Sequence, residues 1–118
     1  MTLAQVPSVF GVLAVLVVGA GVVFRPEALE VVGVSAVTPL GRTEVRAVFG
    51  GMFVAMGAVC LVTRHPYAFL TVGALWLGDA AVRVFAILVD RPKPAEALAV
   101  LAVGTIVGAL IVSGFWAW

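Results

Sequence analysis

Apolar residues fill four long stretches of the chain, and most charged residues gather in the segments between them. A helix rises 1.5 Å per residue, so about 20 apolar residues cross a hydrocarbon core of about 30 Å. The pattern predicts four membrane-spanning α-helices, at residues 7–24, 44–63, 66–89 and 95–118. The first stretch carries no charge and no Lys or Arg precedes it, which favours a retained span over a cleaved signal peptide.

The connections between these stretches predict how the helices are arranged. Residues 64–66 and 90–94 form short turns that contain proline, so the helices flanking each turn should be antiparallel neighbours. The longer first connection contains Pro26–Gly33, which fits a short interfacial helix or an ordered loop with one helical turn. We expect an all-α, integral membrane four-helix antiparallel bundle, a single domain over residues 1–118 with a short interfacial helix in the first loop.

Composition agrees with a membrane location. Of the 118 residues, 64% are hydrophobic and 11% are charged, whereas globular domains average about 45–50% and about 25%. The mean hydropathy is +1.24. A soluble domain of this size has too much surface for its volume to bury so many apolar side chains. Lipid is therefore the expected solvent for them.

Several function classes are disfavoured. The net charge of +1 provides no basic field for nucleic acid. Cys60 and His65 are the only residues of their kinds, which rules out an intrachain disulfide and makes a zinc site or a bis-histidine haem implausible. We expect no cofactor. No nucleophile–base pair or phosphate loop is visible, so we predict no catalytic residues and no enzyme activity.

Charged residues within the spans form the candidate site. Asp79 lies about 16 Å inside the third span, where a carboxylate costs about 2.5–3.5 kcal/mol. Arg83, four residues on, shares its helix face and can pair with it. Two more charges begin the second span on the same side of the membrane, and a tryptophan lies one turn from the aspartate. The predicted charge network or ligand site therefore comprises Glu44, Arg46, Trp76, Asp79 and Arg83.

Two interpretations of these charges stay open. Ionisable residues inside a membrane often mark a proton relay or an anchor for a ligand head group. A neutral ion network can instead lock two helices together. The balanced signs favour the structural interpretation. Small residues predict where helices pack, because close backbone approach drives association in lipid, and the expected packing positions are Gly50, Gly51, Gly78, Gly104 and Gly108.

The distribution of basic residues predicts orientation. Arg25 and Arg42 lie in the first connection and Arg91 and Lys93 in the third, whereas the opposite side has only Arg64. Basic loops stay in the cytoplasm. We therefore expect both termini to be periplasmic.

Glu44–Gly51 has the form E-x-R-A-x-(F/Y)-G-G, and Gly78–Arg83 has a glycine-then-arginine pattern. Both resemble an uncharacterised family of small bacterial four-helix membrane proteins, a domain of unknown function distantly similar to the DoxX-like group. The resemblance covers most of the chain, although Arg91 stands where the family pattern has glycine. It implies a four-helix bundle in a bacterial inner membrane and singles out Glu44, Arg46, Gly50, Gly51 and Arg83. It implies no activity.

Two functions remain as hypotheses. The first is a non-enzymatic bundle that binds a lipophilic ligand, or a small subunit of a larger membrane complex, with lipid or further copies of the chain as partners. The alternative is a small dimeric proton-coupled transporter, similar in size to the small multidrug-resistance proteins. Their essential carboxylate is in the first span, which here is uncharged. Asp79 is the only deep carboxylate, and Arg83 should hold it ionised, which makes it a poor proton carrier.

Overall fold

All regular secondary structure in the computed structural model of residues 1–118 is helical, and there are no strands. Four helical stretches are long and apolar enough to cross a membrane, and they are Leu3–Phe24, Pro39–Thr63, Pro66–Asp90 and Pro94–Ala117. The prediction of an all-α chain with four helices of spanning length is confirmed.

The first two stretches are built from several elements. A 3₁₀ turn, η1 (Leu3–Gln5), leads into α1 (Val6–Phe24). The second stretch runs without a break from α2 (Pro39–Val45) through a π-helical segment, η3 (Arg46–Gly51), into α3 (Met52–Thr63). The π-helical segment lies within Glu44–Gly51, and such segments often mark functional positions in helices.

The second stretch begins five residues before the predicted start at Glu44. The Thr38 side chain accepts a hydrogen bond from the backbone N–H of Gly41 at 3.0 Å, and Pro39 occupies the first turn. A threonine cap followed by proline is a strong helix start. The low mean hydropathy of residues 39–43 predicts a loop there, and the capping signal outweighs it.

The first connection contains η2 (Pro26–Val32), a 3₁₀ helix that ends at Gly33, where φ is +86°. This is the short helix expected in the first loop. Leu29 of η2 is buried with Val22 and Val45, so the connection is packed onto the ends of α1 and α2.

The last two stretches are α4 (Pro66–Asp90), α5 (Pro94–Val112) and the short α6 (Gly114–Ala117). Helix α4 ends at Arg91, whose φ of +49° is left-handed. Glycine adopts that conformation without steric cost. This is a physical reason for a glycine to be preferred at position 91.

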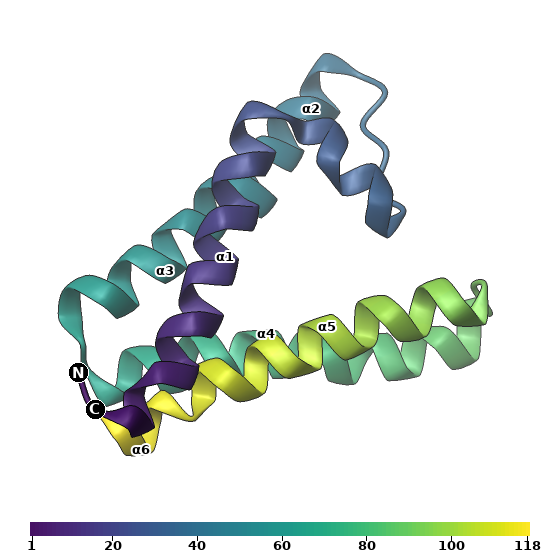
Figure 1. Cartoon of the computed structure of the whole chain (residues 1–118). Coiled ribbons are helices and arrows are strands. Elements are labelled where there is room, and N and C mark those ends of the chain that lie inside the picture. The colour runs from purple at the N-terminus through teal and green to yellow at the C-terminus, as the bar shows by residue number, and fades with distance from the viewer.

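The long helices form two pairs that diverge like the arms of a V (Figure 1). One arm is α1 packed along η3 and α3, and the other is α4 packed along α5. Both termini lie at the apex. The backbones of α3 and α4 approach each other only near their connecting turn. Each pair is antiparallel, and the two pairs do not close into the single bundle that the sequence predicts.

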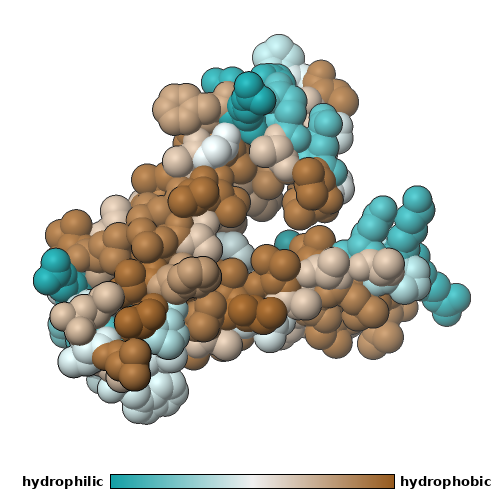
Figure 2. Space-filling view, viewed as in Figure 1, coloured by the Kyte–Doolittle hydropathy of each residue, from teal (hydrophilic) through white to brown (hydrophobic).

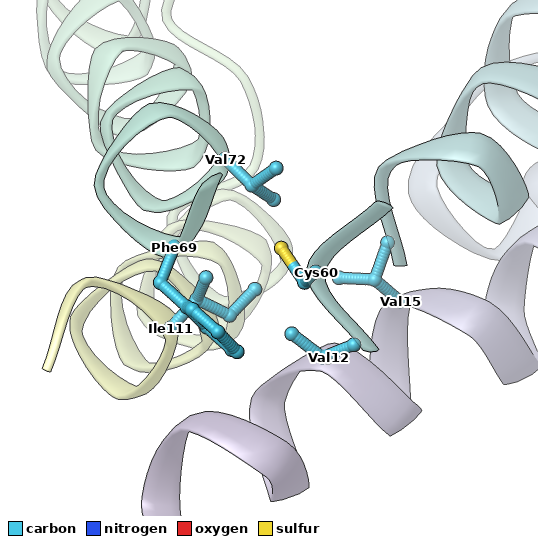
Figure 3. Close-up of a cluster of buried hydrophobic side chains, with 6 residues drawn as sticks. All are labelled: Val12, Val15, Cys60, Phe69, Val72 and Ile111. Carbon is cyan, nitrogen blue, oxygen red and sulfur yellow. The ribbon is translucent and has the colours of Figure 1, made fainter. Parts of the chain in front are cut away.

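A core of six buried side chains at the apex joins the two pairs (Figure 3), and it comprises Val12, Val15, Cys60, Phe69, Val72 and Ile111. The ring of Trp118 stacks on Phe69, with ring centroids 5.3 Å apart. The Trp118 indole N–H also donates a hydrogen bond to the buried Ser8 hydroxyl at 2.9 Å. This tryptophan therefore ties the C-terminus to α1.

Candidate functional site

The space between the two helix pairs contains a cleft of about 610 Å³. Figure 2 shows the hollow between the arms, with mostly hydrophobic walls. Of its 19 lining residues, 15 are hydrophobic, and they come from α1, η2, η3, α3, α4 and α5. Its volume falls within the range of about 300–1,000 Å³ that is usual for small-molecule sites.

Glycines hold each pair together tightly. A Cβ on Gly19 of α1 would lie 2.9 Å from the carbonyl oxygen of Gly50, and one on Gly50 would lie 2.6 Å from Cγ2 of Val23. In the other pair, a Cβ on Gly73 would lie 2.7 Å from the backbone nitrogen of Val112. Real Cβ atoms do not come so close, so these backbones can meet only at glycine.

Large side chains instead separate the two pairs. The rings of Phe53 on α3 and Trp76 on α4 meet across the cleft, with centroids 5.1 Å apart. Gly11 of α1 lets the two pairs meet at the apex, where its Cβ would lie 2.8 Å from Cγ1 of Ile111, whereas farther along aromatic rings lie between the pairs. The same arrangement brings Trp76, a predicted site residue, into the wall of the cleft.

The predicted packing glycines lie in different surroundings. Gly50 and Gly108 make close helix contacts; a Cβ on Gly108 would lie 2.9 Å from Cδ2 of Leu77. A Cβ on Gly51 would make only ordinary contact, and one on Gly78 would meet nothing within 4 Å. Gly104 lines the cleft, where a Cβ would lie 3.9 Å from Oδ2 of Asp79.

Close contacts also occur at glycines that the sequence did not single out, and these are Gly11, Gly19, Gly57, Gly73 and Gly114. Each lies within a long apolar stretch or directly after one, and the preference for small residues at helix contacts applies to all of them. Hydropathy alone cannot show which face of a uniformly apolar helix meets its neighbour.

The predicted pair of Asp79 and Arg83 is formed. The Arg83 Nε–H donates to Oδ2 of Asp79 at 2.7 Å, and both side chains line the cleft. Their side chains are 48% and 41% exposed in the isolated chain. Each ion is thus paired, although the cleft around it is apolar.

The other two predicted charges lie elsewhere. Glu44 and Arg46 are exposed, form no ion pair and do not line the cleft. They lie toward the outer end of the first arm, which diverges from α4. The structure therefore does not bring the four charges together, because the expected network assumed that the second and third spans pack along their length.

A second ion pair outside the long helices links η2 to α2. Arg42 donates to the carboxylate of Glu27. A backbone hydrogen bond at Glu27 and the bond from Arg42 hold the pKa of this exposed carboxyl below its usual value of 4.5. This pair fastens the first connection to the following helix.

Glu96 is the site residue that sequence reasoning passed over. It lies in the first turn of α5 and lines the cleft from the same helix pair as Asp79 and Arg83. An acidic residue at a helix N-terminus is common because it interacts favourably with the helix dipole, so its position in the sequence does not mark it as a site residue. With Glu96 included, the cleft has three charged residues and otherwise apolar walls apart from Gly104.

No group of three His, Cys, Asp or Glu side chains is close enough to hold a metal ion. The cleft can accept an apolar chain along its walls and a charged head group near Arg83 and Glu96. Comparison with protein-family models, with curated proteins and with solved structures finds no match to this chain.

Proposed function

We propose that this chain is an integral membrane protein that binds a lipophilic molecule in the cleft between its two helix pairs. The observation that carries the proposal is the cleft itself, with 15 hydrophobic residues among its 19. A site with these walls offers little to a polar solute, whereas an apolar chain can fill it with many van der Waals contacts.

A membrane location accounts for the outer surface of the molecule. Side chains such as Val17, Phe85 and Ile106 point outward and are 71%, 66% and 58% exposed. Figure 2 shows hydrophobic surface along both arms, with hydrophilic residues gathered toward their ends. We propose four crossings of a bacterial inner membrane with both termini in the periplasm, as the positions of the basic loops indicate. The cleft would then open sideways to lipid.

A proton-coupled transporter remains a second candidate, because Asp79 lines a cleft that is closed at the apex by the buried core. The ion pair argues against it, since Arg83 already donates to Oδ2 of Asp79, the carboxylate that would have to carry the proton. Substrate-driven proton flux in liposomes that disappears in folded Asp79→Asn would promote this candidate. We expect no such flux.

The binding proposal is tested by filling the cleft. Gly104→Phe places a ring in the cleft, where the nearest atom to its Cβ is 3.9 Å away. Gly78→Phe is the matched control, because it adds the same ring to the neighbouring helix at an open position outside the cleft. Native mass spectrometry from mild detergent should show a bound lipophilic molecule on wild type and on Gly78→Phe.

Gly104→Phe should lose that molecule while remaining folded. Retention of the same molecule by Gly104→Phe would contradict binding in the cleft. A bound protein subunit in place of a small molecule would instead support the hypothesis of a larger membrane complex, in which a partner helix occupies the cleft.

A further inference from the structure

The three charges in the cleft lie at successive heights along it. Asp79 and Arg83 are about 16 Å and about 10 Å from the end of α4 at Asp90, at 1.5 Å per residue. Glu96 is about 3 Å from the start of α5 at Pro94 by the same measure. From the interior toward the open end the charges are therefore negative, positive and negative, and their net charge is −1.

Arg83 has donors to spare. Its Nε–H bonds to Asp79, and it makes no other hydrogen bond or ion pair. A guanidinium has five N–H donors in a planar fork that matches a phosphate with two parallel hydrogen bonds. The bond to Asp79 fixes the guanidinium and leaves both terminal nitrogens available to a ligand.

Glu96 has no partner. Its carboxylate forms no hydrogen bond and no ion pair, although it lines the same cleft as Arg83. Glu96 is exposed in the isolated chain, and because a carboxylate only accepts hydrogen bonds, a ligand group with N–H donors and positive charge would complement it. A purely anionic head group would satisfy Arg83 but would face two carboxylates.

We propose that the occupant of the cleft is an aminophospholipid. Its phosphate binds the free nitrogens of Arg83, its primary ammonium binds Glu96, and one acyl chain lies along the wall formed by Val100, Val103 and Val107. This inference rests on the proposed function and names its ligand class. A choline head group has no N–H to donate to Glu96, and a glycerol head group has no positive charge.

The test offers delipidated protein in mild detergent equal amounts of phosphatidylethanolamine, phosphatidylcholine and phosphatidylglycerol with identical acyl chains. Native mass spectrometry then measures which lipid is retained. Wild type should retain phosphatidylethanolamine about tenfold over each of the others, as expected for one charge-assisted hydrogen-bonded contact. Glu96→Gln should lose this preference, and Glu96→Lys should shift it toward phosphatidylglycerol.

Two further variants complete the design. Glu30→Gln removes an exposed carboxylate that lies outside the cleft, and it should keep the wild-type preference. The double variant Asp79→Asn/Arg83→Gln removes the guanidinium together with its ion-pair partner and leaves Glu96, so it should retain less of all three lipids and keep a preference for phosphatidylethanolamine.

The outcomes separate the two proposals. One lipid per chain without head-group preference, or with phosphatidylglycerol preferred by wild type, would overturn the aminophospholipid and leave binding in the cleft standing. A preference that survives Glu96→Gln would also overturn it. Failure of folded wild type to retain any lipid would overturn both the ligand class and the proposed function.

Discussion

The ion pair in the cleft provides a quantitative test of where the chain resides. Asp79 and Arg83 are one helical turn apart and joined by a 2.7 Å bond. A pair with this spacing on a water-exposed helix is worth about 0.3–0.5 kcal/mol. If the cleft holds lipid in a membrane, removing one partner leaves an uncompensated charge that costs about 2.5–3.5 kcal/mol. The two settings differ enough for a double-mutant cycle to distinguish them.

We predict that Arg83→Ala alone lowers the free energy of unfolding by about 2–3 kcal/mol, because Asp79 is left unpaired in an apolar cleft. The double variant Asp79→Ala/Arg83→Ala should be less destabilised than Arg83→Ala. The assay is reversible unfolding in lipid bicelles, followed by helical circular dichroism. The reasoning would be refuted if the stability losses of Asp79→Ala and Arg83→Ala add up to the loss of the double variant to within about 0.5 kcal/mol. Such additivity would show that the two charges act independently.

The chain contains a matched control for this cycle. Glu27 and Arg42 also form an ion pair, but they lie in η2 and α2, where the side chains are 52% and 40% exposed. Because both charges are largely solvated, their coupling should be clearly weaker than that of Asp79 and Arg83. Because the folded-state pKa of Glu27 is lowered, this contribution is present above pH 4.5 and is lost as the pH falls through the lowered value.

Three further predictions concern packing, the turn and topology. Gly19→Ala should destabilise by about 1–3 kcal/mol in a bicelle unfolding assay, because its Cβ meets backbone atoms of the neighbouring helix, whereas Gly21→Ala meets nothing within 4 Å and should be neutral or stabilising. Arg91→Gly should stabilise by about 1 kcal/mol by relieving its left-handed backbone, and a lower melting temperature would contradict this. In a background without the native cysteine, a cysteine at Thr2 should react with an impermeant maleimide from outside the cell, and one at Lys93 should not; the reverse would invert the proposed orientation.

Hydropathy was sufficient for the four long helices because each is a run of apolar residues bounded by proline or charged residues. The helix start at Pro39 was missed because capping by Thr38 acts through backbone hydrogen bonds that hydropathy ignores. The bond between Asp79 and Arg83 was predictable because spacing of four within one helix places two side chains on one face.

The divergence of the pairs was not predictable from hydropathy. It depends on which faces carry glycines and which carry aromatic rings, as at Gly19 and Trp76. Uniformly apolar helices conceal that difference. For the same reason Glu44 and Arg46 were placed near Asp79, and Glu96 was left out of the site.

The central claim, that the cleft holds one lipophilic molecule, is tested most directly at Trp76, whose side chain lines it. A lipid with brominated acyl chains, which quench tryptophan fluorescence, is titrated into delipidated protein in unbrominated detergent. The fluorescence of Trp76→Phe under the same conditions is subtracted from that of wild type, so that the difference reports Trp76 alone. The account predicts quenching that saturates near one lipid per chain and disappears in Gly104→Phe. Quenching that rises in proportion to the lipid fraction, and is unchanged by Gly104→Phe, would show that Trp76 meets only bulk lipid and would contradict the account.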